Sequence, residues 1–150
     1  MAITVRRLCA GHDTAAATAL LIRFFVEEGF DTPADVIRRR TAEMAAIDAC
    51  GLFLAEQREA AIGVATVSLE FGIEFGWSAE MGDLYVVPEW RGKGVSRALL
   101  GAIENLLAER GASGYQVTVT PFAQEHHDLR AYYAKLGFTG EGRLILRKTI

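Results

Sequence analysis

Hydrophobic positions along the chain follow two periods, and the longer one marks the helices. Apolar residues recur every three to four positions within residues 20–25, 95–107 and 129–136, which is the spacing of an amphipathic helix. Capping residues and glycines bound these segments. We therefore predict helices over residues 14–29, 96–110 and around 127–136.

A further helix is indicated by its start signal. Thr32 and Pro33 place a capping hydroxyl before a proline, and Asp35 follows three residues after the threonine, an arrangement typical of a helix N-terminus. The helix should run toward Cys50. Its Arg-Arg-Arg run at residues 38–40 is interpreted as a solvated face.

The shorter period, rich in β-branched and aromatic residues, predicts the strands. They are expected over residues 3–8, 52–56, 60–70, 80–87, 115–120 and 143–148. A helix separates the fourth strand from the fifth, which implies a parallel pair with a right-handed crossover. Strands two to four should form an antiparallel meander, so the expected fold is an α/β (α+β type) mixed sheet with helices on both faces.

Composition limits the class of protein. The 150 residues are 51% hydrophobic and 23% charged, and no linker divides them, which predicts a single globular domain over residues 1–150. No apolar run approaches the roughly 20 residues of a membrane span. We see no signal peptide and expect a cytoplasmic protein. Cys9 and Cys50 lack metal-ligand spacing, so no metal is expected. A net charge of −3 argues against nucleic-acid binding.

Charge is unevenly distributed along the chain. No Lys or Arg occurs between Arg58 and Arg91, whereas six acidic residues lie there, namely Glu59, Glu70, Glu74, Glu80, Asp83 and Glu89. From charge alone, this segment is either a solvated acidic face or a surface that receives a cation.

A basic, glycine-rich turn follows the acidic segment. Residues 86–97 read VVPEWRGKGVSR and join a predicted strand to a predicted helix, a junction where bare amides and the helix dipole favour an anion. The dinucleotide pattern would need glycine in place of Arg97. The P-loop pattern would need Ser or Thr in place of Gly94. The anion is therefore expected to be bound in neither of these ways.

Two motifs resemble those of the GCN5-related N-acetyltransferases, the GNAT superfamily. Residues 91–96, Arg-Gly-Lys-Gly-Val-Ser, follow a strand that ends Val-Val-Pro, as in the family's Arg/Gln-x-x-Gly-x-Gly/Ala loop. Residues 133–138, Tyr-Ala-Lys-Leu-Gly-Phe, match its Tyr-x-Lys-x-Gly-Phe motif. The resemblance covers essentially the whole chain and implies a mostly antiparallel sheet of six to seven strands.

The resemblance implies acetyl-CoA as the acyl donor. Backbone amides of Val86 or Val87 would polarise the thioester. The pyrophosphate would be held by the loop residues Arg91, Gly92, Lys93, Gly94, Val95 and Ser96. Ser96 replaces the family's usual glycine or alanine and is small enough to preserve the loop. His126 stands where the family often has an asparagine that contacts the pantetheine arm.

The resemblance also suggests the groups that move protons. Tyr133 occupies the position of the family tyrosine that protonates the departing thiolate. Glu80 and Asp83 are the candidate bases for the amine. They differ in parity, so a regular strand would present only one of them to the cleft, but family members often bulge this strand.

The acidic segment then suggests the acceptor. Glu70, Glu74, Trp77 and Asp83 are expected to edge its binding site and to attract a small cationic amine resembling an aminoglycoside or a polyamine. An aminoglycoside acceptor would imply a role in antibiotic resistance. Two alternatives remain: an acetyltransferase for protein N-termini or lysines, and a non-catalytic acyl-CoA sensor. The apolar C-terminal strand could support a homodimer, and the sequence leaves this open.

Overall fold

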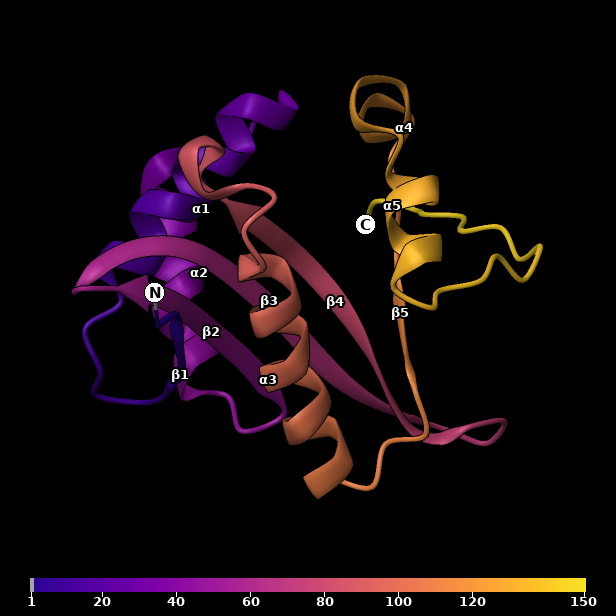
Figure 1. Ribbon diagram of the computed structural model, residues 1–150. Coiled ribbons are helices and arrows are strands. Elements are labelled where there is room, and N and C mark those ends of the chain that lie inside the picture. The colour runs from indigo at the N-terminus through magenta and orange to yellow at the C-terminus, as the bar shows by residue number, and fades with distance from the viewer. Residues whose placement is uncertain (1) are drawn as a thin grey trace. The chain divides into compact units, whose positions relative to one another are not determined.

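The computed structural model describes residues 2–150, which divide into one compact unit up to Thr118 and another from Val119 to Ile150. The first unit contains a five-stranded sheet in which the strands lie side by side in chain order (Figure 1). The strands are β1 (Thr4–Leu8), β2 (Cys50–Gln57), β3 (Ala60–Gly72), β4 (Gly76–Val86) and β5 (Tyr115–Val117). β1 to β4 pair antiparallel, and β5 pairs parallel with β4.

Helices cover both faces of this sheet, as predicted. α1 (Ala15–Glu28) and α2 (Ala34–Ala46) pack on one face, and α3 (Val95–Glu109) crosses the other (Figure 1). A short 3₁₀ turn, η1 (Pro88–Trp90), joins β4 to the loop before α3. No helix within residues 2–150 combines the length and the apolar content needed to cross a membrane.

The α3 face of the sheet is closely packed where the helix crosses Gly63 of β3. Val95, Leu99 and Ile103 are at most 1% exposed. A Cβ built on Gly63 of β3 would lie 2.9 Å from Val95 Cγ1 and 3.2 Å from the Tyr85 carbonyl oxygen. Glycine at this position therefore allows the helix to approach the sheet.

β4 contains a bulge that positions the candidate site. The register of β3 and β4 shifts between Thr66 and Val67, so that Thr66 pairs with Asp83 while Val67 pairs with Met81. Gly82 is the extra residue. An extra residue in one strand reverses the alternation of side chains beyond it, so residues on either side of Gly82 no longer follow simple parity.

The second unit differs from the prediction. It holds two short helices, α4 (Pro121–His127) and α5 (Leu129–Lys135), where one helix over 127–136 was expected. Thr120 caps α4 by accepting a hydrogen bond from the Ala123 amide. Asp128 between the helices has φ +45°, a left-handed conformation that breaks helical continuity.

The predicted strand over residues 143–148 is not formed, and the predicted fifth strand ends at Val117. The expectation of six to seven strands was therefore wrong: residues 2–150 contain five. Leu144 and Leu146 are 86% and 91% exposed. A strand needs a neighbour to satisfy its backbone, and residues 119–150 contain no other strand.

Gly63→Ala is expected to destabilise the protein by roughly 1–3 kcal/mol, because the added methyl group overpacks the contact between β3 and α3. Gly101→Ala in α3 is the matched control, since nothing lies within 4 Å of its Cβ position. This change should stabilise the helix by about 0.5–1 kcal/mol. Urea unfolding measures both changes, and equal effects of the two substitutions would contradict the packing described here.

Candidate functional site

The two candidate bases lie on one face of the sheet. Asp83 pairs with Thr66, and Glu80 pairs with Ser68. Thr66 and Ser68 are two residues apart on β3, and paired residues project to the same face. The bulge at Gly82 therefore directs both carboxylates to the face covered by α1 and α2.

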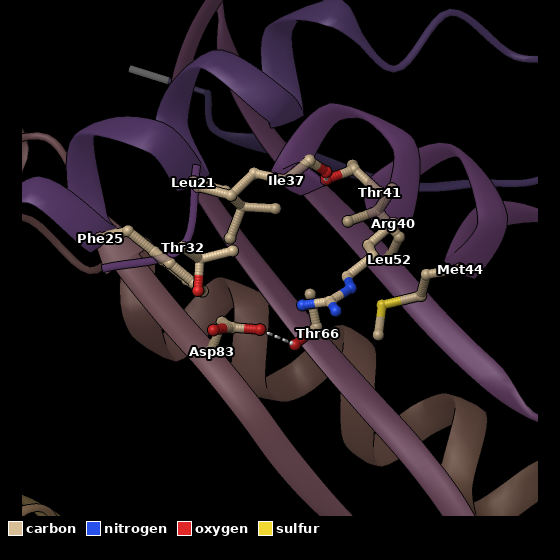
Figure 2. A pocket seen from close by; sticks show the side chains of 10 residues that line it. All are labelled: Leu21, Phe25, Thr32, Ile37, Arg40, Thr41, Met44, Leu52, Thr66 and Asp83. Atoms are coloured by element: carbon tan, nitrogen blue, oxygen red, sulfur yellow. Dashed lines mark hydrogen bonds between the residues drawn. The ribbon is translucent and has the colours of Figure 1, made fainter. Parts of the chain in front are cut away.

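Asp83 has the more unusual surroundings of the two. It lines a cavity of about 180 Å³ between the sheet and α1 and α2 (Figure 2). Burial raises the pKa of its carboxyl, and a 2.6 Å hydrogen bond from the Thr66 hydroxyl partly opposes this shift. The pKa stays above its ordinary value, so Asp83 is a stronger base than an exposed aspartate.

Glu80 lies outside this cavity. Its Oε1 accepts a hydrogen bond of 3.1 Å from the Thr118 hydroxyl, which ties it to the residue just after β5. Of the two carboxylates, Asp83 lines this pocket and Glu80 does not.

Backbone amides at the end of β4 face two directions. The Val87 N–H donates to the Ile62 carbonyl at 3.0 Å, so this amide is occupied by β3. Amides alternate in direction along a strand, and those of Leu84 and Val86 therefore face the opposite edge. β5 pairs only with Ala79–Met81 on that edge. Within the first unit, the geometry thus favours Val86 over Val87 as a donor to a ligand.

The loop after η1 combines an open backbone with positive charge. Gly92 and Gly94 have φ values of +74° and +87°, where a side chain would be strained. Gly94 is also the N-cap of α3, and this cap has no side-chain hydrogen bond. The Lys93 ammonium lies 5.2 Å from the centre of the Trp90 ring. Amides, helix dipole and ammonium together make the loop suited to an anion.

Arg91 connects this loop to β4 and α1. Its Nε donates to the Val86 carbonyl at 2.9 Å, and its Nη2 donates to Glu27 Oε2 at 3.1 Å. The other Glu27 oxygen accepts a 2.7 Å hydrogen bond from the Tyr85 hydroxyl. Burial acts to raise the pKa of Glu27, but these hydrogen bonds and the charges of nearby arginines outweigh it and lower the pKa.

Glu27 and Tyr85 in this network were not predicted from the sequence. Helical spacing offered a signal, because Glu27 lies three residues after Phe24 on the same helix and both approach Tyr85. Arg91 was assigned to pyrophosphate, yet two of its nitrogens are engaged within the protein.

The outer acidic residues are not gathered around Asp83. Glu70 pairs with Ser78 on the same face, about four strand residues or roughly 13 Å from Asp83. Glu74 lies in the turn between β3 and β4. Trp77 contacts the Phe71 ring at 5.2 Å and projects to the opposite face, because it precedes Ser78 by one residue. The structure thus brings Glu80 and Asp83 together on one face and leaves Trp77 on the other.

Tyr133 and His126 belong to the second unit. The Tyr133 ring contacts the rings of Tyr132 and Phe138 at 5.2 and 5.3 Å. Its carbonyl accepts hydrogen bonds from the Leu136 and Phe138 amides, so the second motif forms a compact helix end. The His126 ring stacks on Phe122 at 4.0 Å, and its Nδ1 lies 2.8 Å from the Phe122 carbonyl.

Comparison with known proteins identifies the family. The model of the acetyltransferase (GNAT) family matches residues 15–138. No curated protein matches the chain.

Three solved structures illustrate the shared fold. AAC(6')-Iy bound to a bisubstrate analogue, CoA-S-monomethyl-acetylneamine, is 19% identical with a TM-score of 0.83, and the alignment covers 100% of this chain and 99% of that one. An integron cassette protein from a salt-marsh metagenome is 26% identical with a TM-score of 0.78, and the alignment covers 97% of this chain and 90% of that one. Ribosomal-protein-alanine N-acetyltransferase from Brucella melitensis is 17% identical with a TM-score of 0.77, and the alignment covers 99% of this chain and 100% of that one.

Asp83→Asn is expected to raise the melting temperature at pH 7 and to change it less at pH 4. The folded protein raises the pKa of Asp83. The stability this carboxyl contributes is therefore fully present below its unfolded pKa of about 4 and is lost as the pH rises through the folded value. The neutral amide of asparagine avoids that loss. Each kcal/mol of unfolding free energy recovered in this way should raise the melting temperature by roughly 2–4 °C. Circular dichroism melts from pH 4 to 8 measure the difference, and a constant difference would contradict this interpretation.

Proposed function

The chain belongs to the GNAT acetyltransferase family and is an acetyl-CoA-dependent enzyme, and from this premise we propose that it acetylates a primary amine of a small molecule. The amine arrives as an ammonium cation. Asp83 is the base, Val86 supports the acetyl carbonyl, and the loop at residues 91–96 holds the coenzyme.

The observation that carries this proposal is the position of Asp83. An amine with a pKa near 10 is almost wholly protonated at neutral pH and must lose a proton before it can attack a thioester. Asp83 offers a part-buried carboxylate with a raised pKa at the wall of a cavity. The amides of Leu84 and Val86, which face the open edge of the sheet, follow Asp83 by one and three residues.

The loop fits the pyrophosphate of acetyl-CoA. Space is open where a Cβ would stand on Gly92 and on Gly94, and the cap of α3 carries no side-chain hydrogen bond. We assign the contacts to the loop residues Arg91, Gly92, Lys93, Gly94, Val95 and Ser96. Arg91 contributes by fixing the loop to Glu27, and His126 is assigned to the pantetheine arm on its sequence position.

The proposed reaction is balanced in protons. Acetyl-CoA supplies an acetyl group activated as a thioester. Asp83 accepts one proton from the ammonium, and the amine nitrogen bonds to the acetyl carbon as the carbon–sulfur bond breaks. The Val86 N–H stabilises charge on the carbonyl oxygen, a contribution of about 3 kcal/mol for such donors. Tyr133 donates its phenolic proton to the departing sulfur and is reprotonated by the proton that the new amide nitrogen loses.

A second candidate acceptor is an aminoglycoside or a polyamine. Structures similar in fold include an aminoglycoside acetyltransferase from a soil metagenome, solved with sisomicin. Glu70 and Glu80 share a face with Asp83, which would favour an acceptor with several positive charges. Such an enzyme would confer resistance to aminoglycosides.

Asp83→Asn is expected to lower the rate of acetyl transfer by about 100-fold or more, the usual contribution of a general base. Glu80→Gln should lower it by less than about tenfold, since the amide can still accept the Thr118 hydrogen bond. Coenzyme A release, detected with a thiol reagent, measures both rates. Comparable losses for the two variants would remove Asp83 as the specific base, and turnover by neither variant nor wild type would favour the sensor.

Tyr133→Phe is expected to reduce kcat by about 100-fold or more, because the departing thiolate would lack its proton donor. Coenzyme A affinity, measured by isothermal titration calorimetry, should be nearly unchanged. Tyr132→Phe is the matched control for loss of a phenol from the same helix. If the Tyr133→Phe enzyme keeps its full kcat, Tyr133 is not the proton donor and its ring contributes only to packing.

A further inference from the structure

The cavity beside Asp83 has charged groups at separate points of a lining that is otherwise made of apolar side chains and three threonines. Leu21 and Phe25 of α1, Ile37 and Met44 of α2, and Leu52 of β2 provide the apolar walls. Figure 2 shows the carboxylate of Asp83 and the guanidinium of Arg40 both directed into the space, with Thr66 between them in this view.

Arg40 is the only member of the arginine run that lines this cavity. It lies three residues after Ile37 and four before Met44, so these three lie along one side of α2 beside the pocket, with Arg40 at its solvent-exposed margin. Arg38 and Arg39 do not line it. The interpretation of residues 38–40 as a solvated face is confirmed, since all three arginines are exposed, and Arg40 in addition lines the open side of this pocket.

The Arg40 guanidinium retains its hydrogen-bond donors. Within residues 2–150 it forms no hydrogen bond or ion pair, unlike Arg91 and Arg110, which pair with Glu27 and Asp48. A guanidinium has five donors in a planar fork that fits a carboxylate. Arg40 is thus positioned to bind an anionic group of a molecule in the cavity.

Asp83 and Arg40 do not neutralise each other. No ion pair joins them. Burial raises the pKa of Asp83, the Thr66 hydrogen bond acts in the opposite direction, and no cation contributes to the shift. The cavity therefore offers a negative and a positive group at two separate places. The molecule that complements both groups carries an ammonium and an anion.

We propose that the acceptor is a small amino acid with an apolar side chain, bound with its ammonium at Asp83 and its carboxylate at Arg40. The side chain packs against Phe25, Met44 and Leu52. This inference rests on the proposed acetyltransferase function and specifies its substrate. Asp83 takes one ammonium proton, the nitrogen–carbon bond forms as the carbon–sulfur bond breaks, and the products are an N-acetyl amino acid and coenzyme A.

Cavity size and charge both favour this acceptor over a polycation. The volume of about 180 Å³ lies below the roughly 300–1,000 Å³ of common ligand pockets, so only part of an aminoglycoside would be held in this half-open pocket. A second ammonium near Arg40 would be repelled by the like charge.

Matched substrates test the requirement for a carboxylate. L-leucine, L-methionine, L-leucinamide, 3-methylbutylamine, spermidine and kanamycin would be compared by coenzyme A release. We expect L-leucine or L-methionine to have a kcat/KM at least about tenfold above that of L-leucinamide and 3-methylbutylamine, the effect of one charge-assisted hydrogen bond. Equal values with and without the carboxylate, or a preference for spermidine or kanamycin, would overturn the proposal.

Substitution of Arg40 tests the residue itself. Arg40→Met should raise the KM for the amino acid by roughly 10- to 100-fold while leaving kcat and the KM for 3-methylbutylamine nearly unchanged. Arg39→Met removes the same charge from the neighbouring exposed position and should behave as wild type. An equal rise in KM for both substrates, or equal effects of the two variants, would overturn the role of Arg40.

A binding measurement separates failure of this inference from failure of the proposed function. Isothermal titration of L-leucine and L-methionine into the protein with coenzyme A needs no turnover. Binding that is lost in Arg40→Met supports the amino-acid site even if acetylation fails. Acetylation of amines without saturable binding of an amino acid would overturn the amino-acid acceptor while leaving the proposed acetyltransferase function in place.

Discussion

The bulge at Gly82 is the constraint on which the candidate site depends. A regular β4 would send Glu80 and Asp83 to opposite faces, and Asp83 could not then share the α1 and α2 face with Glu80. Gly82 has little room for a side chain, because a Cβ there would lie 3.2 Å from Thr66 Oγ1. The same Thr66 hydroxyl donates to Asp83, so the backbone irregularity and the hydrogen bond support one another.

Arg91 links the two ends of the proposed coenzyme site. Its guanidinium bonds to the carbonyl of Val86, whose amide faces the open edge of β4, and to Glu27 on α1. Movement of the glycine loop would therefore disturb the strand end and the helix that walls the acceptor cavity. The salt bridge is half-exposed, with 47% and 38% of the two side chains accessible, and such pairs contribute little stability. Its effect is to orient the loop.

The sequence predicted the features that depend on local pattern. The helices α1, α2 and α3, the parallel pairing of β4 with β5 and the family itself followed from periodicity and motifs. The last predicted strand failed because residues 143–148 have strand-like alternation but no neighbouring strand in their unit. The choice between the two acids depended on a one-residue register shift that pattern alone does not reveal. The place of Arg40 at the pocket was missed because all three adjacent arginines are solvent-exposed, and only helical spacing separates Arg40 from the other two.

A part-buried aspartate without a cationic partner makes the resting fold less stable than its sequence could allow. Asp83 has one neutral hydrogen-bond donor, and burial disfavours its charged form. Natural selection for stability alone would replace it with an apolar or amide side chain. A ligand whose ammonium bound beside this carboxylate would stabilise the folded state by mass action, so adding such a ligand during purification and storage should protect the protein from unfolding.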